Sequence, residues 1–268
     1  MNRRHVVLVF TAGALAAGLA MLQHTPGTQG QQSSKKILVV THATGFRHDS
    51  RKTAAEAVRL LGAVTHKWDV LADASNTEEL QAWMTPGKLK EIDLVFFANT
   101  TGDLGLTSDQ KKAFYGWIRE GGAYAGVHSA ADTYHGDADY LDLLRGEFES
   151  HGAQVKVVIR NQDPAHPATK DVPPTFEIYD EIYLFKHWSR YTVHVLLSMK
   201  AHPEQPEVTG DFPVAWTSRM GKGRIFYTSL GHREDVYLNR IYLDHLAGGL
   251  RWALGLEDGD DTRGNPIR

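Results

Sequence analysis

The segment SDQKKAFYGWIREGGAYAGVHSA (residues 108–130) decides the fold class, because it joins a helix to a buried strand and then turns sharply. Residues 108–119 have the polar and apolar spacing of an amphipathic helix. The glycine pair 121–122 ends that helix, since glycine accepts the left-handed backbone of a helix stop. The short apolar run 123–127 then predicts a buried strand. Helix followed closely by buried strand is the repeating unit of a parallel α/β sheet.

The same alternation extends back to residue 36. The first apolar run is β-branched and ends in a polar loop, which is typical of a strand buried on both faces. Helix-sized gaps separate it from the following apolar runs, which favours a parallel, doubly wound sheet. The predicted strands are 36–41, 64–70, 92–98 and 123–127, and the predicted helices between them are 50–61, 77–84 and 108–119.

The second half of the chain is less regular. We expect extended segments at 154–160, 176–185 and 193–199, a β-hairpin formed by 214–218 and 224–229, and a closing helix at 240–254. No linker interrupts residues 36–256, so one domain is expected there, followed by a polar tail at 257–268.

The first 35 residues differ from the rest in composition. Arg3 and Arg4 precede the apolar run Val6–Leu22, and a polar stretch follows it. This is the pattern of a secretory signal peptide, so residues 1–35 are predicted to be a signal peptide and linker. We therefore expect export to the periplasm or the extracellular space. The alternative is an uncleaved signal that tethers the protein to the membrane.

The composition excludes several kinds of site. The chain has 268 residues, 14 histidines and no cysteine, with a formal net charge of −3. Without cysteine it has no disulfide, thiolate nucleophile or iron–sulfur cluster. The net charge offers no electrostatic case for nucleic acid binding. The glycine-rich run 221–224 is too short for a phosphate-binding loop and no helix follows it, so no nucleotide cofactor is expected.

Histidine follows three of the predicted strands. His48 lies in the loop after the first strand, His128 directly follows the fourth, and His232 follows the hairpin. Open α/β sheets bind ligands at the carboxyl ends of their strands, so we expect the three imidazoles around one pocket. Because imidazole is the commonest metal ligand, a divalent metal such as zinc is one hypothesis for this pocket. The alternative is that each ring merely caps its own loop.

The run Gly126-Val127-His128-Ser129-Ala130 resembles a nucleophile elbow, a sharp strand-to-helix turn between small residues. The exposed position of that turn carries His128 instead of serine or cysteine. Imidazole cannot replace a thiol in acyl transfer, but it can bind a metal or act as a general base. His128 is therefore a catalytic candidate. Ser129 has no positional argument as a nucleophile and is taken as a substrate-binding candidate.

Two acids lie between two tyrosines at Tyr179-Asp180-Glu181-Ile182-Tyr183. In an extended segment Asp180 and Glu181 point to opposite faces, so only one can reach the pocket. Both are catalytic candidates, and the alternative is an edge strand with solvated acids. Tyr183 is a substrate-binding candidate, because aromatic rings beside acids suit a sugar. Arg47 and His166, the latter between two prolines of a rigid loop, are the remaining substrate-binding candidates.

Taken together, these motifs resemble the ThuA-like (trehalose-utilisation) family. The resemblance implies the class I glutamine amidotransferase-like superfamily and hence a flavodoxin-like three-layer sandwich with a mainly parallel sheet and an added β-hairpin. In that superfamily the elbow usually carries cysteine, so His128 argues against amidotransferase activity. The matching runs are Gly45–His48, Gly126–Ala130, Glu147–His151, His166–Thr169, Asp180–Tyr183, Pro213–Trp216 and Gly221–His232.

The resemblance implies a role in carbohydrate metabolism, and two hypotheses follow. The first is an enzyme that isomerises, cleaves by elimination, or hydrolyses a disaccharide or 3-keto-sugar derivative, with a divalent metal in the site. The second is a non-catalytic sugar-binding module, or a partner of a secreted sugar oxidoreductase. In both, the ligand is a small sugar. Self-association into a homo-oligomer is a further partner hypothesis.

Overall fold

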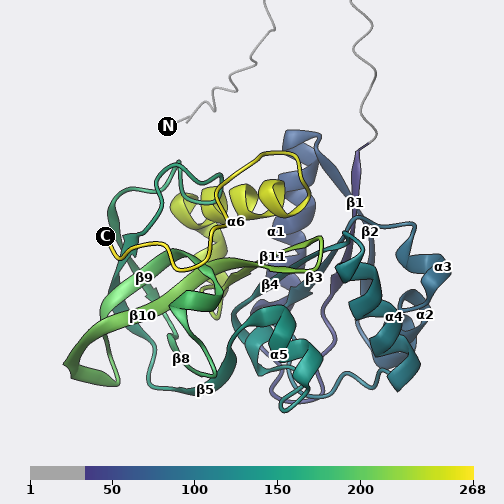
Figure 1. Ribbon diagram of the computed structural model, residues 1–268, viewed down its shortest axis with the longest axis horizontal. Coiled ribbons are helices and arrows are strands. Elements are labelled where there is room, and N and C mark those ends of the chain that lie inside the picture. Colours follow the sequence, from purple (N-terminus) through teal and green to yellow (C-terminus); the bar gives the residue numbers. More distant parts are fainter. Residues whose placement is uncertain (1–33) are drawn as a thin grey trace, which may run out of the picture. The chain divides into compact units, whose positions relative to one another are not determined.

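The computed structural model describes residues 34–268 and builds a nine-stranded and a two-stranded sheet from them (Figure 1). The small sheet pairs β5 (Glu147–His151) with β8 (Tyr183–Lys186). The large sheet has the order β2 (Trp68–Ala74), β1 (Lys35–Val40), β3 (Leu94–Ala98), β4 (Ala123–Val127), β11 (Gly223–Thr228), β10 (Gln205–Met220), β9 (His194–His202), β6 (Val155–Asn161) and β7 (Thr175–Asp180).

Strand direction divides the large sheet into two parts. From β2 to β11 every pairing is parallel, and the order along the sheet is the 2-1-3-4-5 order of flavodoxin-like folds. From β11 to β7 every pairing is antiparallel. Consequently β9 and β7 point the same way as β4, and among the described strands of this sheet β10 and β6 run against it. The predicted mixed α/β fold with a mainly parallel sheet is confirmed.

Helices cover both faces of the sheet, because the side chains of each strand alternate between two apolar clusters. In β1, Ile37 and Val39 belong to one cluster, and Leu38 and Val40 belong to the other. The first cluster includes residues of α1 (Ser50–Thr65) and α6 (Arg240–Ala253). The second includes residues of α2 (Thr77–Trp83), α3 (Pro86–Leu89), α4 (Ser108–Arg119) and α5 (Ala138–Leu144). The result is three layers, helix–sheet–helix (Figure 1).

The observed element boundaries differ from the predicted ones in two places. Helix α1 runs to Thr65, and His66 ends it with a left-handed backbone, so β2 begins at Trp68 and not at residue 64. The extended segment predicted at 176–185 is two strands in different sheets, because the chain leaves β7 after Asp180. Three short 3₁₀ helices complete the structure: η1 (His128–Asp132), η2 (Arg190–Thr192) and η3 (Glu234–Leu238).

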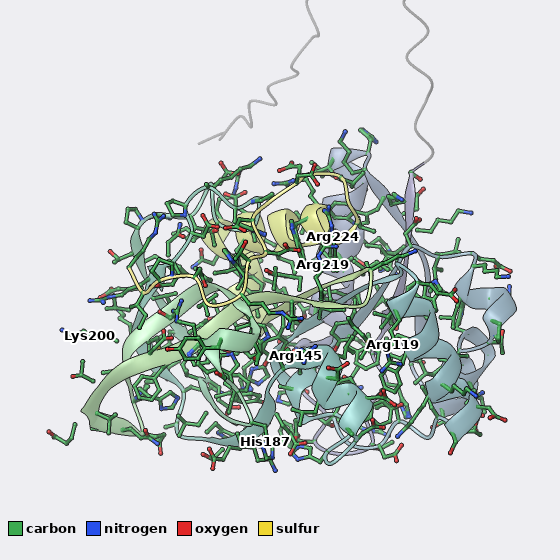
Figure 2. All side chains as sticks on the ribbon, viewed as in Figure 1. Arg119, Arg145, His187, Lys200, Arg219 and Arg224 are labelled. Atoms are coloured by element: carbon green, nitrogen blue, oxygen red, sulfur yellow. The ribbon has the colours of Figure 1, made fainter. Side chains whose placement is uncertain are left out.

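The C-terminal segment 257–268 lies against the domain. Arg219 and Arg224, both labelled in Figure 2, form ion pairs with aspartates of this segment. Asn265 exchanges two hydrogen bonds of 2.8 and 2.9 Å with the backbone of β9. The predicted hairpin is present as the antiparallel pair β10–β11, whose turn contains Gly221 with a φ of 59°.

The predicted signal peptide and linker, residues 1–35, lies outside the described residues except for its last two positions. Between residues 34 and 268, the structure contains no helix that is both long enough and apolar enough to cross a membrane.

Candidate metal centre

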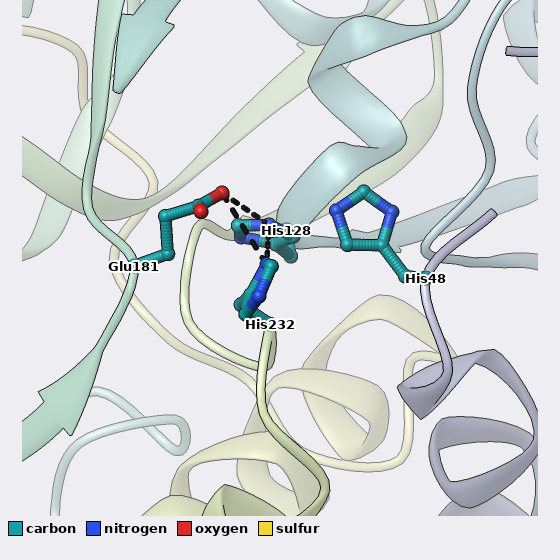
Figure 3. A group of neighbouring side chains, drawn as sticks. All are labelled: His48, His128, Glu181 and His232. Atoms are coloured by element: carbon teal, nitrogen blue, oxygen red, sulfur yellow. Dashed lines mark hydrogen bonds and ion pairs between the residues drawn. The ribbon is translucent and has the colours of Figure 1, made fainter. Parts of the chain in front are cut away.

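Four side chains from separate segments meet at the carboxyl edge of the sheet (Figure 3). His48 follows β1, His128 follows β4, His232 follows β11, and Glu181 follows β7. Their candidate ligand atoms all lie within 4.8 Å of one another. Because β1, β4, β11 and β7 point the same way, their carboxyl ends share one edge. The predicted convergence of the three histidines is therefore confirmed, and the structure adds Glu181 to them.

His128 occupies the sharp turn between β4 and η1. Its backbone φ of 45° lies in the left-handed region that residues other than glycine rarely adopt. A small residue is required at Gly126, because a Cβ there would lie 2.8 Å from the Cβ of Ala130. The fully buried ring donates its Nδ1–H to the carbonyl oxygen of Ser229 at 2.8 Å, since a carbonyl can only accept. When the ring is neutral, this bond keeps the lone pair on Nε2, the atom that faces the cluster.

Asp180 fixes the loop that carries His232. Its carboxylate accepts hydrogen bonds from the backbone N–H groups of Gly231 at 2.7 Å and Arg233 at 3.3 Å, on either side of the histidine. The Asp180 side chain is fully buried by these contacts. Of the two neighbouring acids, Glu181 faces the cluster and Asp180 holds the loop. The catalytic role predicted for Asp180 is thus replaced in our interpretation by a positioning role.

Gln154 contacts the ring nitrogen of His232 that faces away from the cluster. Arg233 Nη1 donates to Gln154 Oε1 at 2.7 Å, which leaves the amide nitrogen facing His232 Nε2 at 2.9 Å. In this orientation His232 Nε2 accepts, and Nδ1 carries the proton toward the cluster. Turning the amide by 180° would let its oxygen accept from Nε2–H and free Nδ1 for a metal, provided that Arg233 Nη1 moves away from the amide nitrogen that would then face it. His128 is therefore ready to bind a metal as it stands, whereas His232 becomes ready when Gln154 turns.

His48 is held from its ring and from its backbone. Ser129 Oγ lies 3.2 Å from His48 Nδ1, and Arg51 Nε donates to the His48 carbonyl oxygen at 2.9 Å. Burial, and then the positive charges of His128 and His232, lower the pKa of His48 to about 3. The ring is neutral near pH 7 and has a lone pair to offer. Ser129, a substrate-binding candidate, is fully buried and contacts this ring.

Glu181 is shared between the cluster and a further histidine. Its Oε1 lies 3.5 Å from His128 Nε2 and 3.3 Å from His232 Nδ1, and its Oε2 lies 3.2 Å from His151 Nδ1. Burial raises the pKa of Glu181, but hydrogen bonds from the protonated forms of His128 and His232, and the positive charges of those forms, outweigh burial and hold this pKa well below its usual range. The carboxylate therefore stays ionised, as a metal ligand must.

The spacing of three of these atoms fits an ion such as zinc. Zinc–nitrogen bonds of about 2.0–2.1 Å place the corners of a tetrahedron roughly 3.3 Å apart. The atoms His128 Nε2, His232 Nδ1 and Glu181 Oε1 are separated pairwise by 3.2, 3.5 and 3.3 Å. Two imidazoles and one carboxylate are the ligand set of a catalytic zinc site that keeps an open position. His48 offers a fourth donor beside this triangle (Figure 3).

Two cavities open onto the cluster. The larger has a volume of about 480 Å³ and the smaller of about 300 Å³. Phe46, His48 and His232 form part of the walls of both. Arg47 lies in the wall of the larger cavity and Tyr183 in the wall of the smaller, where its ring centroid is 4.2 Å from that of the elbow histidine. Both candidates thus reach the neighbourhood of the cluster.

His166 is not brought to this site. It lines a separate cavity of about 230 Å³, together with His194, Asp163 and residues of the C-terminal segment. Strand direction is the reason: β6 runs against β4, so the loop after β6 lies at the opposite edge of the sheet. The substrate-binding role expected for His166 is therefore corrected to a place in a second histidine cluster.

Three neighbours of the cluster were not predicted from the sequence: Phe46, His151 and Gln154. Phe46 and His151 lie within runs that carried the family resemblance, so that resemblance was the available signal. Gln154 lies in no pattern that would single it out, because its contacts come from His232 and Arg233, more than 70 residues away in sequence.

Comparisons with known proteins give one family match and several matches in fold. The family model ThuA, described as trehalose utilisation, matches residues 36–253. A putative ThuA-like protein from Bacteroides uniformis ATCC 8492 is 21% identical, with a TM-score of 0.66 over 86% of this chain and 95% of that chain. Another, from Parabacteroides merdae ATCC 43184, is 17% identical, with a TM-score of 0.70 over 87% of this chain and 96% of that chain.

A more distant likeness is to a β-galactosidase from Bacillus circulans sp. alkalophilus, 12% identical with a TM-score of 0.54, over 82% of this chain and 31% of that chain. At such identities the solved structures show the fold alone. A search of the curated proteins found no match.

Proposed function

The chain belongs to the ThuA (trehalose-utilisation) family, and from this premise we propose that its histidine–glutamate cluster is a metal-dependent site that processes a disaccharide or a 3-keto-sugar derivative. The observation that carries the proposal is the triangle of His128 Nε2, His232 Nδ1 and Glu181 Oε1, with separations of 3.2–3.5 Å beside two open cavities. Such a triangle fits one ion and leaves room for a substrate oxygen.

A divalent metal at this position would supply Lewis-acid polarisation of a sugar carbonyl or hydroxyl oxygen. His128 and His232 would hold it through nitrogen and Glu181 through oxygen, and His48 would lie beside the position left open for substrate. The neutral imidazole of His48 and the ionised carboxylate of Glu181 have the protonation states that metal binding requires.

Proton transfer is assigned to the imidazole of His151 in this proposal, and Glu181, whose low pKa makes it a weak base, orients that ring. The carbon next to the carbonyl of a 3-keto sugar bears an acidic proton, and its removal leads to isomerisation or elimination. Glu181 Oε2 lies outside the metal triangle and contacts His151 Nδ1 at 3.2 Å. The His151 side chain is 43% exposed, so this contact connects the buried carboxylate to solvent. His128 then acts as a ligand and not as the base.

Arg47 and Tyr183 are proposed to bind the sugar from the walls of the two cavities. Ser129 acts indirectly, because its hydroxyl contacts the ring of His48. Export to the periplasm or the extracellular space remains part of the proposal and rests on the basic start and apolar run before residue 23. A secreted sugar oxidoreductase is a fitting partner, because it would generate 3-keto sugars.

The experiment combines metal analysis with a substrate screen. Purified protein is analysed for bound metals and incubated with oxidised and unoxidised disaccharides, before and after chelation and with added zinc. We expect about one metal ion per chain, and turnover that chelation abolishes and zinc restores. Sugar binding without metal and without turnover would instead favour a non-catalytic sugar-binding module. Neither metal nor sugar binding would contradict the proposal altogether.

A further inference from the structure

Phe46 is an exposed aromatic side chain whose backbone is fixed. The side chain is 68% exposed, although burying a phenylalanine stabilises a protein by roughly 1.5–3 kcal/mol. The Phe46 carbonyl accepts a hydrogen bond from Thr101 Oγ1 at 2.7 Å, and the N–H of Gly45 donates to the Thr101 carbonyl at 3.3 Å. Its ring stands edge-on to His48, with centroids 4.8 Å apart. An apolar ring held this way beside a polar cluster offers a contact surface to a ligand.

The two cavities that Phe46 lines differ in character. Charged and amide side chains line the larger one: Arg47, Asp49, Gln154, Arg233, Glu234 and Asp235. Rings and acids line the smaller one: Asp132, Phe148, His151, Glu181 and Tyr183. Aromatic rings pack against the apolar face of a sugar, whereas paired charges bind its hydroxyl groups. Each volume lies in or near the range of small-molecule sites, about 300–1,000 Å³.

The cavities also meet at the cluster, since His48 and His232 belong to both walls along with Phe46. A ligand that occupies both cavities must therefore pass over these residues. A ligand with a single ring can fill only one cavity at a time.

We propose that the two cavities are two subsites for one two-unit sugar, and that Phe46, the apolar wall common to both, is a specificity-determining residue. This inference rests on the proposed function. One ring of the substrate occupies the aromatic cavity and the other the charged cavity, which places the bond between them over His48 and His232. The site then discriminates against free monosaccharides, because they lose every contact of one subsite.

The test measures affinity by isothermal titration of the zinc-loaded protein with glucose, trehalose and cellobiose, each unoxidised and 3-oxidised. We expect the best disaccharide to bind at least tenfold more tightly than glucose in the same oxidation state. Arg47→Ala, which alters the larger cavity alone, should weaken disaccharide binding about tenfold and change glucose binding less than twofold. Phe46→Ala should weaken disaccharide binding about tenfold, and Phe46→Trp should restore it.

Tyr191→Ala is the matched control, because Tyr191 is an aromatic residue that is 83% exposed and outside both cavities. It should leave all affinities unchanged. Equal affinities for glucose and for the disaccharides, or equal losses for both in Arg47→Ala, would overturn the two-subsite proposal while leaving the carbohydrate site intact. Absence of binding by every sugar would instead defeat the proposed function, and the subsites with it.

Discussion

The sheet carries a group of buried or half-buried histidines at each of its two edges. At the carboxyl edge, His48, His128 and His232 surround Glu181. At the opposite edge, His166 and His194 lie beneath the C-terminal segment, beside Asp163. Both groups combine imidazoles with a carboxylate, and both adjoin a cavity. In sequence they would be equally good candidates for a metal or catalytic site.

Their hydrogen bonds separate them. His194 has an acceptor at each ring nitrogen, the carbonyl of Thr262 and the carboxylate of Asp163, both at 2.9 Å. His166 Nδ1 accepts from the backbone N–H of Ala168 at 3.1 Å. These contacts attach the C-terminal segment and the 163–169 loop to the domain. At the carboxyl edge, His128 donates from Nδ1 to a backbone carbonyl, and its Nε2 faces Glu181 and His232.

Residue type alone therefore does not identify the site. The direction of the free ring nitrogens does, because a metal needs several lone pairs aimed at one point. We therefore expect the carboxyl-edge cluster to bind a metal and the opposite cluster to stabilise the fold.

The largest expected effect is on stability, at the structural cluster. His194→Ala should lower the free energy of unfolding by about 3–5 kcal/mol, because it leaves the Asp163 carboxylate nearly buried and without its partner. Urea unfolding measures this. Adding Asp163→Asn to the variant should recover part of the loss, and bound metal per folded chain should stay at the wild-type value. Loss of metal in His194→Ala would contradict a purely structural role for the cluster at the opposite edge.

The pH dependence of stability should also reflect a buried structural histidine. Burial lowers the pKa of His245 to about 4, against an ordinary value of 6.5, while its hydrogen bond to the Ala168 carbonyl opposes the shift. The unfolded chain takes up this proton near pH 6.5 and the folded chain only near pH 4. Stability should therefore fall as the pH drops through this window, by about 3 kcal/mol from this residue.

His245→Asn isolates that contribution, because asparagine has no proton to take up in the window. Urea unfolding at pH 7 and pH 4 should show a drop that is smaller by about 3 kcal/mol in the variant than in the wild type. An identical drop in both proteins would mean that His245 already takes up its proton in the folded state.

The third expected effect is on metal binding and turnover. His128→Asn should remove the bound metal and lower turnover by roughly a hundredfold or more, with little change in the unfolding midpoint. Asparagine tolerates the left-handed backbone that His128 adopts. His66→Asn is the matched control, since His66 is exposed and also has a positive φ, of 54°. Wild-type metal content and turnover in His128→Asn would make the residue a structural filler of its turn.

The smallest effect concerns the orientation of one ligand. Gln154→Glu should raise zinc affinity about tenfold, because a carboxylate accepts from both Arg233 and His232 Nε2–H and so leaves Nδ1 free. Gln154→Leu should lower it by about tenfold or more, since neither hydrogen bond remains. Competition with a chromogenic chelator gives both values. Equal zinc affinities in the two variants would show that this amide does not set the tautomer of His232.

Much of the fold was readable from local pattern. The helix at 108–119 and the strand at 123–127 were predicted with the bounds that the structure has, because capping, glycine stops and apolar runs act over a few residues. The turn at His128 was readable for the same reason. Boundaries failed at His66 and after Asp180, where tertiary packing extended one helix and divided one strand.

The sequence by itself determined the α/β alternation, the elbow and the three strand-end histidines, because each is a property of neighbouring residues. Only the tertiary structure decided that Glu181, and not Asp180, faces the cluster, and that His166 lies at the other edge. It also brought Gln154 to His232 across 78 residues of sequence. The reason is strand direction in the second half of the sheet: no local pattern records whether a strand runs with or against its neighbours, yet that choice sets the edge at which every following loop emerges.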